Sequence, residues 1–422
     1  MRKIALRSLQ FICTLGLILI LTSVAFGATR LTFWHGFGGT EGDKLTQLVD
    51  RWNKNNPDIR VEIIYIPYDQ LLHKALAGLA GGETPDLLQL DLIAMPQFTR
   101  SGKVVNLDGY IENSRVDMKD FYPSLLEYDY YNGHCYALPL TTNNLGLMWN
   151  KDMFRRAGLD PEVPPRYWDE LIKYAQKLNN PGKMEWGFVQ ATEVGVRGEG
   201  ITWEYMIYLW QNRGEFMVDN YSKPAFNSKE GIEALQFKVD LIHKYKVSPV
   251  RQIQGGFLTG KVGMALQGPW MLQTIREQAI VDFGTAFAPY PKDGKPASNI
   301  GGEHVCIIKS NPERERAAWK FLNWLISPDT MVDWFMGTGY VPVRKSILTN
   351  PRYQKWLKDE EPKMRPFIEQ QQYARPRPPI PQYAAISYAF AVEVEKTYLG
   401  KSSPAQVLKA AEDAVIKIMK AK

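Results

Sequence analysis

Hydrophobic residues in the first part of the chain alternate between short continuous runs and a helical spacing. Apolar runs predict buried strands at 31–34, 60–66 and 85–90. The first helix between them would bury Leu45, Leu48, Val49 and Trp52. The second would bury Leu72, Ala75, Leu76 and Leu79. This β-α-β-α-β order predicts a mostly parallel sheet with helices on both faces.

Aromatic and polar side chains follow the ends of these strands. The segment "WHGFGG" at 34–39 follows the first strand, Tyr68 follows the second, and Asp91 follows the third. Ligands of open parallel sheets bind outside the carboxyl ends of the strands, so the three segments would meet at one rim. Glycines let a ligand approach the backbone closely, and rings supply flat apolar surface. We therefore expect a ligand-binding rim that contains Trp34, His35, Tyr68 and Asp91.

From about residue 145 the alternation of predicted strands and helices begins again. Apolar runs predict strands at 145–150, 186–190, 261–267, 283–291 and 299–310. Helical spacing predicts helices at 168–179 and 317–325, with further helices up to about residue 244. The second half of the chain is therefore expected to form another α/β lobe.

The length of the chain indicates the number of lobes, and its net charge bears on the kind of partner. A chain of 422 residues is longer than one core supports, about 250–300 residues, so two lobes with separate cores are expected. The net charge is +6, and three of the basic residues lie in the first 27 positions, which hold no acidic residue. The remaining balance of +3 predicts no nucleic-acid partner.

The N-terminus has the pattern of an export signal. Three basic residues precede an apolar run at 9–21, and Ala25 and Gly27 provide the small residues of a cleavage site before Ala28. We expect residues 1–27 to be a cleaved signal peptide and the mature protein to be periplasmic or extracellular. The alternative is an uncleaved membrane anchor, for which the apolar run is short.

Cys135 and Cys306 are the two cysteines of the expected mature chain. Cysteines in an oxidising compartment either pair or stay buried. Each lies in a strand-like segment, "GHCYAL" and "EHVCII". Buried free thiols are favoured over a bridge, which needs Cα atoms within about 7 Å.

Motifs for catalysis were not found. The chain has no nucleophile elbow, P-loop, zinc-protease or paired-cysteine motif, and its five histidines are scattered. Glu303 and His304 could suggest a metal site beside Cys306, but strand alternation sends them to opposite faces. We therefore expect no metal, no cofactor and no enzymatic activity, although two carboxylates at a suitable spacing would be enough for a glycosidase.

Six segments in order resemble one protein family. They are 31–61, "GETPDLLQLD" at 82–91, 136–171 around "LTTNNLGLMWN", "GKVGMALQGPWM" at 260–271, "GGEHVCII" with the helices after it, and "ARPRPPIPQYAAISYAF" at 374–390. Together they are similar to the extracellular solute-binding proteins of ABC transporters, in particular the carbohydrate-binding group. The resemblance covers nearly the whole chain after residue 27.

This resemblance implies an α/β fold of the type II periplasmic-binding-protein kind, with two hinged lobes around a ligand cleft. Residues 28–142 and 301–340 would form the N-terminal lobe, and residues 143–300 and 341–422 the C-terminal lobe. The chain would cross between lobes near 141–144, 299–301 and 339–341.

The resemblance also implies ligand contacts. Trp270 in "QGPW" would stack on a sugar ring, and Trp203 in "ITWE" would do so from the same lobe. The other positions implied by the family pattern are Asn143, Gly302, Tyr340 and Tyr383. One departure is Ser387 beside Tyr388, where maltose-binding members carry a tryptophan after "IPQ".

The implied partners are a small carbohydrate ligand and a membrane permease with its ATPase, with the protein acting as a monomer. An alternative ligand is glycerol 3-phosphate or a glycerophosphodiester, because Arg375 and Arg377 could clamp a phosphate bidentately. A secreted glycosidase and a signalling receptor that presents its closed form to a sensor also stay open.

Overall fold

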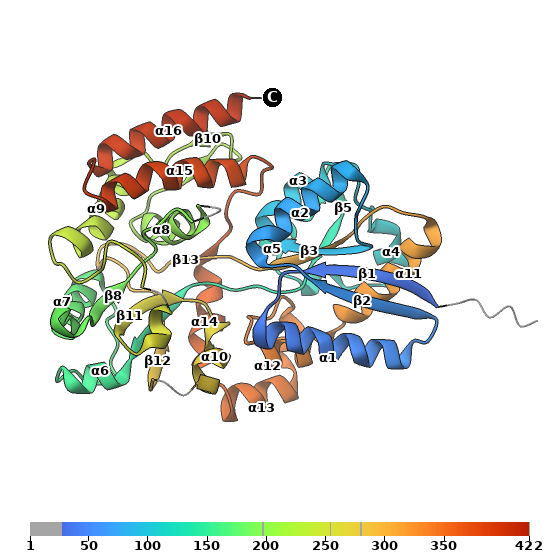
Figure 1. The fold of residues 1–422 in the computed structure, drawn as a ribbon, viewed down its shortest axis with the longest axis horizontal. Helices are drawn as coiled ribbons and strands as arrows, with labels where there is room; N and C mark the ends of the chain where they lie inside the picture. The colour runs from blue at the N-terminus through green and yellow to red at the C-terminus, as the bar shows by residue number, and fades with distance from the viewer. Residues whose placement is uncertain (1–27, 196–197, 254, 279–280, 422) are drawn as a thin grey trace, which may run out of the picture.

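The computed structural model describes residues 28–195, 198–253, 255–278 and 281–421, which form two lobes side by side (Figure 1). The predicted signal peptide at 1–27 lies outside the described residues. Among the helices in these ranges, none combines the length with the apolar composition that a membrane span requires.

The N-terminal lobe is built on a five-stranded sheet in the order β2-β1-β3-β14-β6. Its strands are β1 Thr29–His35, β2 Ile59–Tyr65, β3 Leu87–Asp91, β6 Ala137–Pro139 and β14 Glu303–Ile307. β1 pairs in parallel with β2 and β3, whereas β14 lies antiparallel between β3 and β6. The sheet is therefore mostly parallel with one reversed strand, and the three predicted N-terminal strands are confirmed.

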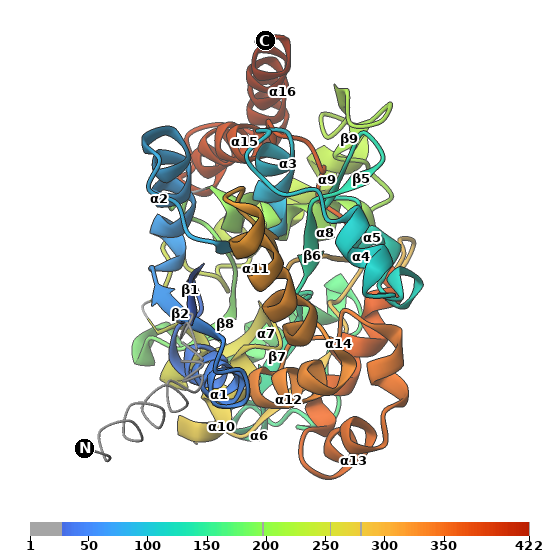
Figure 2. The same ribbon diagram turned by 90° about the vertical axis from the view of Figure 1, so that its right-hand side faces the viewer.

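Helices cover both faces of this sheet. They are α1 Gly39–Asn55, α2 Tyr68–Gly81, α3 Met95–Thr99, α4 Asp108–Asn113, α5 Pro123–Leu126, α11 Pro312–Leu325, α12 Pro328–Thr338 and α13 Pro351–Asp359. In Figure 1, α2 and α3 lie above the sheet and α1 and α12 below it, and Figure 2 shows α11 in front of it. α1 buries the four residues that its spacing predicts. α2 buries Ala75 as predicted, together with Leu71 and Gly78, while Leu72, Leu76 and Leu79 are half-buried. Gly78 allows close approach of the Glu83 carbonyl and the Trp34 ring.

The C-terminal lobe contains a four-stranded sheet in the order β12-β7-β11-β8. The strands are β7 Gly146–Asn150, β8 Trp186–Val189, β11 Val262–Gln267 and β12 Phe283–Ala286. β8 and β11 are parallel, and β7 is antiparallel to β11 and to β12. The lobe's helices are α6 Lys151–Arg156, α7 Trp168–Leu178, α8 Glu199–Gln211, α9 Lys229–His243, α10 Met271–Gln278, α14 Arg365–Gln370, α15 Tyr383–Tyr398 and α16 Pro404–Lys420.

Short pairs of strands complete the fold. β4 Tyr130–Tyr131 pairs with β5 His134–Cys135, β9 Met217–Val218 with β10 Lys223–Pro224, and β13 Ser298–Asn299 with β15 Ala374–Arg375. Cys135 and Cys306 are buried free thiols, as the favoured interpretation predicted. Burial raises the pKa of the Cys306 thiol to about 12, so it stays protonated at neutral pH.

The three segments predicted to cross between the lobes lie side by side. The Asn143 and Gly301 backbones exchange two hydrogen bonds of 3.0 and 2.9 Å, and the Val341 amide donates to the Thr142 carbonyl at 2.9 Å. These bonds hold the three segments as one narrow ladder between the sheets. A connection of this form lets the lobes move relative to one another by small backbone changes.

The chain stays with the N-terminal lobe beyond residue 341. Arg344 and Ser346 both bond to Asp120, and Arg352 pairs with Asp333 of α12. α14, in contrast, packs against β7 and β12 of the C-terminal lobe. We therefore propose that the boundary predicted at 340 lies after α13, and that the chain crosses to the C-terminal lobe there and not at 339–341, because hydrogen bonds tie 341–359 to Asp120 and to α12.

Candidate functional site

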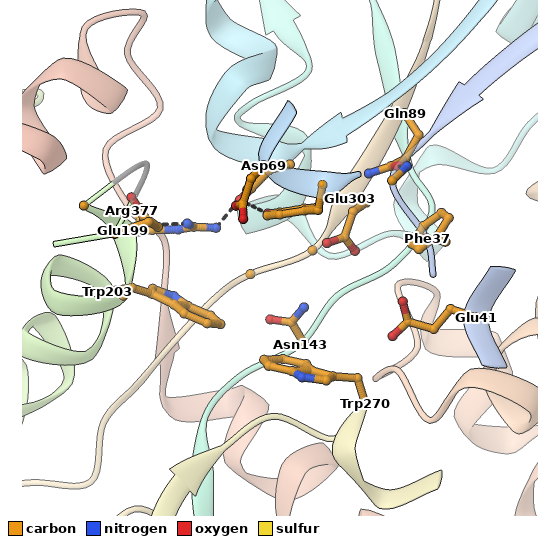
Figure 3. Close-up of a pocket in the computed structure, with 18 of the residues that line it drawn as sticks. Phe37, Glu41, Asp69, Gln89, Asn143, Glu199, Trp203, Trp270, Glu303 and Arg377 are labelled. Atoms are coloured by element: carbon orange, nitrogen blue, oxygen red, sulfur yellow. Dashed lines mark hydrogen bonds and ion pairs between the residues drawn. The ribbon is translucent and has the colours of Figure 1, made fainter. Parts of the chain in front are cut away.

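A cavity of about 500 Å³ lies between the two lobes (Figure 3). Both lobes contribute to its lining. Seven of the ten residues predicted from the sequence are on that lining: Tyr68, Asp91, Asn143, Trp203, Trp270, Gly302 and Tyr340. The structure brings these residues together from segments that are far apart in the chain, while their contact with a ligand stays a prediction.

Two indole rings form the C-terminal side of the cavity. Trp203 lies on α8 and Trp270 in the loop that follows β11, and their ring planes are inclined by 14° with centroids 6.3 Å apart. Gly268 makes the Trp270 position possible, because a side-chain carbon at residue 268 would collide with the indole. Both rings line the cavity, so each can present an apolar surface to a ligand (Figure 3).

The N-terminal side of the cavity is mainly polar. Phe37, Glu41 and Gln89 lie across from the indoles (Figure 3). The side-chain Oε1 of Gln89, in β3, accepts a 2.7 Å hydrogen bond from the Gly36 backbone amide, which orients the Gln89 side chain. The Tyr68 hydroxyl donates to Asp91 Oδ2 at 2.6 Å. The carboxyl ends of β1 and β3 thus supply this side, as the parallel topology predicts.

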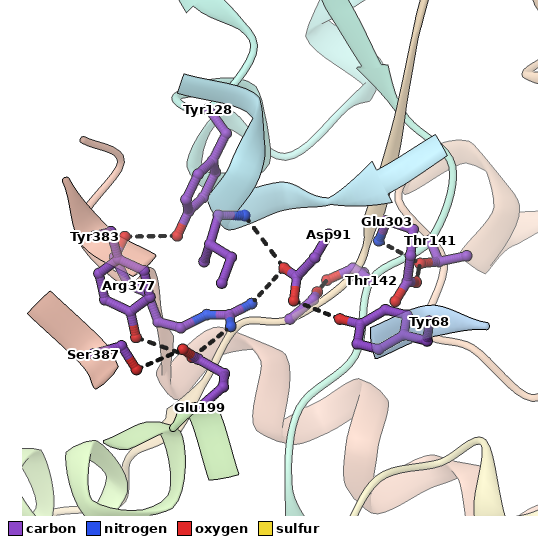
Figure 4. Close-up of polar contacts among 12 residues, drawn as sticks. Tyr68, Asp91, Tyr128, Thr141, Thr142, Glu199, Glu303, Arg377, Tyr383 and Ser387 are labelled. Atoms are coloured by element: carbon purple, nitrogen blue, oxygen red, sulfur yellow. Dashed lines mark hydrogen bonds and ion pairs between the residues drawn. The ribbon is translucent and has the colours of Figure 1, made fainter. Parts of the chain in front are cut away.

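Arg377 connects the two lobes at one end of the cavity (Figure 4). Its guanidinium donates from Nη2 to Asp91 Oδ1 at 3.1 Å and from Nη1 to Glu199 Oε1 at 2.7 Å. Glu199 also accepts bonds from the hydroxyls of Tyr383 and Ser387. Burial alone would lower the pKa of Arg377, but the two carboxylates raise it well above its ordinary value. Arg377 is therefore a permanent cation with both terminal amino groups occupied.

Two glutamates in the cavity have raised pKa values. Burial raises the pKa of Glu303 to about 8, against the opposing hydrogen bond from the Thr141 hydroxyl. Burial likewise raises the pKa of Glu41 to about 7, opposed by a hydrogen bond with Tyr340. A protonated carboxyl group is both a donor and an acceptor of hydrogen bonds. At neutral pH, Glu303 can therefore offer a ligand an O–H donor.

Gly302 places Glu303 on the lining. Its φ is +141°, and a side chain there would collide with the Thr141 carbonyl oxygen. Glycine tolerates this backbone conformation and this close approach. Antiparallel pairing of β14 with β3 puts Glu303 opposite Asp91, so the crossing segment delivers a second carboxyl group to the same rim.

Three predicted site residues are not on the lining. His35 is buried among Phe33, Phe37 and Tyr65, and burial lowers its pKa to about 4. Trp34 points to the opposite face of β1, where the Lys74 ammonium lies 4.8 Å from its ring centroid. Side chains alternate between the two faces of a strand, so Trp34 and His35 point in opposite directions and neither lines the cavity. Gly36 and Phe37, the next residues of "WHGFGG", line it instead.

Tyr383 stands behind the lining. It is fully buried, and its hydroxyl donates to Glu199 Oε1 at 3.0 Å. Ser387, which occupies the region where a tryptophan is expected from the family pattern, bonds to the other Glu199 oxygen at 2.7 Å. Both side chains therefore orient Glu199 and do not face the cavity directly.

Several lining residues were not predicted from the sequence. Glu41 and Glu199 each lie in the first turn of a helix, where an acidic residue is common because it favours the helix N-terminus, so neither stands out. Glu303 was considered only as a metal ligand. Its pairing with Asp91 would have revealed its position, but sheet order is needed for that deduction.

The chain matches a family described as "Bacterial extracellular solute-binding protein" over residues 38–332. The sn-glycerol-3-phosphate-binding periplasmic protein UgpB of Salmonella typhimurium is 27% identical over 420 residues, covering 94% of both chains. The crystal structure of the cyclic alpha-maltosyl-1,6-maltose binding protein from Arthrobacter globiformis is 36% identical, with a TM-score of 0.82 over 94% of this chain and 100% of that one.

UgpB from Mycobacterium tuberculosis, solved in complex with glycerophosphocholine, is 25% identical with a TM-score of 0.83 over 93% of this chain and 98% of that one. These similarities confirm the predicted two-lobed α/β fold. They also confirm the resemblance noted from the six sequence segments. The chain belongs to the bacterial extracellular solute-binding proteins.

Proposed function

We propose that this protein captures a neutral carbohydrate in the cavity between its lobes. The observation that carries the proposal is the surface formed by Trp203 and Trp270 opposite a polar wall. A pyranose has an apolar C–H face and a rim of hydroxyl groups, so it needs a flat ring on one side and hydrogen-bonding groups on the other. Asn143, Asp91 and Glu303 are suitable partners for the hydroxyl groups.

Charge favours a neutral ligand over an anion. Among the described lining residues, six carboxyl groups stand against the single guanidinium of Arg377. These are Glu41, Asp69, Asp91, Glu193, Glu199 and Glu303. Even with Glu41 and Glu303 protonated, four carboxylates remain. Asp91 and Glu199 pair with Arg377, and Glu193 pairs with Arg251, so neither of these arginines is left over to bind a phosphate.

Glycerol 3-phosphate or a glycerophosphodiester is the second candidate, because one relative is named for sn-glycerol 3-phosphate and another was solved in complex with glycerophosphocholine. The phosphate clamp considered from the sequence is weakly supported. Arg375 donates two hydrogen bonds to Glu215, at 3.0 and 2.6 Å, and is not on the lining. Of the three guanidinium nitrogens of Arg377, only Nε lacks a hydrogen-bond partner among the described residues, so only Nε could donate to a phosphate. Rings and carboxylates would suit a quaternary ammonium group, so glycerophosphocholine fits better than glycerol 3-phosphate.

Ligand capture by two lobes has a mechanical consequence. Contacts to both walls form only when the lobes close, so a ligand favours the closed state by its difference in affinity for the two states. We infer that the exported monomer hands its ligand in this closed form to the permease and ATPase of an ABC importer. It would release the ligand unchanged and would not hydrolyse it.

Isothermal titration calorimetry tests the ligand class directly. The mature protein should bind at least one neutral sugar from a panel of mono- and disaccharides with a dissociation constant of about 1 μM, equivalent to about −8 kcal/mol. Preference for glycerophosphocholine, with affinity that falls as salt is added, would favour the second candidate. Product analysis after prolonged incubation should find intact sugar, and any cleavage would identify a glycosidase.

A further inference from the structure

A second cavity of about 230 Å³ adjoins the first one on the side of the C-terminal lobe. Gly200, Trp203 and Gln252 line both cavities. The second cavity then continues into the C-terminal lobe toward Gln190 and Gln267. It is thus an extension of the cleft beyond the indole of Trp203.

The second cavity lies at the carboxyl ends of the parallel pair β8 and β11. Val189 and Ala191 border it from the end of β8, and Leu266 and Gln267 from the end of β11. The carboxyl ends of parallel strands are where open α/β sheets bind ligands. The main cavity uses the same edge of the N-terminal sheet, so both sheets direct this edge toward the cleft.

Buried polar atoms without partners point to a ligand at this place. Gln190 is 4% exposed, and its Nε2 donates to the Lys238 carbonyl at 2.9 Å while its Oε1 has no partner among the described residues. The indole Nε1 of Trp203 also lacks one. An unpaired buried acceptor or donor is costly, and a hydroxyl group can satisfy either kind.

The charges around this cavity are already balanced. Glu204, on its wall, pairs with the fully buried Lys238 and accepts a 2.9 Å bond from the Ala191 amide. Neither charge is left over for an ionic ligand. The cavity therefore suits an uncharged group that carries hydroxyls.

We propose that the second cavity binds a further sugar unit of a di- or oligosaccharide whose first unit rests on Trp203 and Trp270. The inference builds on the proposed function, since it specifies the length of the carbohydrate. Gly200 lines both cavities and lies next to the place where they adjoin. A side-chain carbon there would meet only the Ala191 methyl carbon, at the ordinary contact distance of 3.6 Å, so the absent side chain leaves this place open.

Gly200→Leu tests this proposal because its side chain would fill this place. Gly200 is the second residue of α8, and Gly109, the second residue of α4, provides a matched control with open space around it. Leucine favours helix more than glycine does, so both variants should fold. Calorimetry would use glucose, galactose, mannose and fructose together with maltose, lactose, trehalose and sucrose.

In the wild type, at least one disaccharide should bind ten times more tightly than every monosaccharide. Gly200→Leu should reduce that ratio at least tenfold, and Gly109→Leu should keep it. Equal affinity for both lengths, or an unchanged ratio in Gly200→Leu, would overturn the inference while leaving sugar binding intact. Failure of every sugar to bind would instead overturn the proposed function. If Gly200→Leu does not fold, a crystal structure of the wild-type complex decides: a sugar ring beside Gln190 supports the inference, and ordered water alone refutes it.

Discussion

Replacing Glu303 by glutamine should change how the stability of the protein depends on pH. Burial raises the pKa of this carboxyl group from 4.5 to about 8, although the Thr141 hydroxyl donates a hydrogen bond to it. Glutamine has nearly the same shape, and its carbonyl oxygen can accept the same bond. The substitution therefore removes an ionisable group and keeps the packing.

The direction of the effect follows from proton counting. Between pH 4.5 and about 8, the folded protein keeps a proton on Glu303 that the unfolded chain has released. The free energy of unfolding of the wild type should therefore fall as pH rises through this window, on the order of 1 kcal/mol per pH unit. Below pH 4.5 both states hold the proton, and above pH 8 both have lost it, so the contribution is constant at either end.

Urea unfolding from pH 4 to 9 measures this difference. Glu303→Gln should gain stability relative to the wild type across the window, and the gap should stop growing above about pH 8. Glu41 adds its own slope only up to about pH 7, so the interval from 7 to 8 isolates Glu303. Glu112→Gln, an exposed change on α4, is the control. Parallel curves for wild type and Glu303→Gln would refute the buried, protonated carboxyl group.

Two further substitutions separate binding from stability. Trp270→Ala should weaken sugar binding at least tenfold by calorimetry, since a ring buried against a sugar contributes about 1–3 kcal/mol to binding, and it should change the melting temperature little. Trp324→Ala removes a half-buried ring outside the cavity, so it should lower the melting temperature and leave sugar binding unchanged. Unchanged affinity in Trp270→Ala would remove that ring from the site. Arg377→Met should lower the free energy of unfolding by about 3–5 kcal/mol in urea, because Asp91 and Glu199 lose their shared partner; a loss below 1 kcal/mol would show that this pairing is unimportant.

Much of the fold could be predicted from the sequence because its signals are local. The face of α1 is visible as a spacing within 17 residues, and most of the predicted strands are short stretches rich in apolar residues. The face of α2 is harder to predict, since apolar residues occupy most of its length. Gly78 lies against the Glu83 carbonyl and the Trp34 ring, and the latter contact comes from β1, far away in the sequence.

The cavity could be predicted only in part. Tyr68 and Asp91 follow from topology, because strand ends meet at one edge. Trp34 and His35 satisfied the same reasoning, but side chains alternate between the two faces of a strand. Packing on those faces buries His35 among aromatic rings and places Trp34 against Lys74 of α2. The ion pair between Glu199 and Arg377 links residues 178 positions apart in the chain, so no local sequence pattern predicts it.

Arg377 is best understood from the positions of its two partners. Asp91 ends a strand of the N-terminal lobe and Glu199 begins a helix of the C-terminal lobe. Any opening that separates these carboxylates breaks one of the two ion pairs and leaves a buried charge without its partner, unless water enters to hydrate it. Closing the lobes restores both pairs around the proposed ligand cavity. The arginine that resembled a phosphate clamp in the sequence therefore ties the lobes together in the structure, and under the proposed function the ligand contacts fall to the two indoles, Asn143, Asp91 and Glu303.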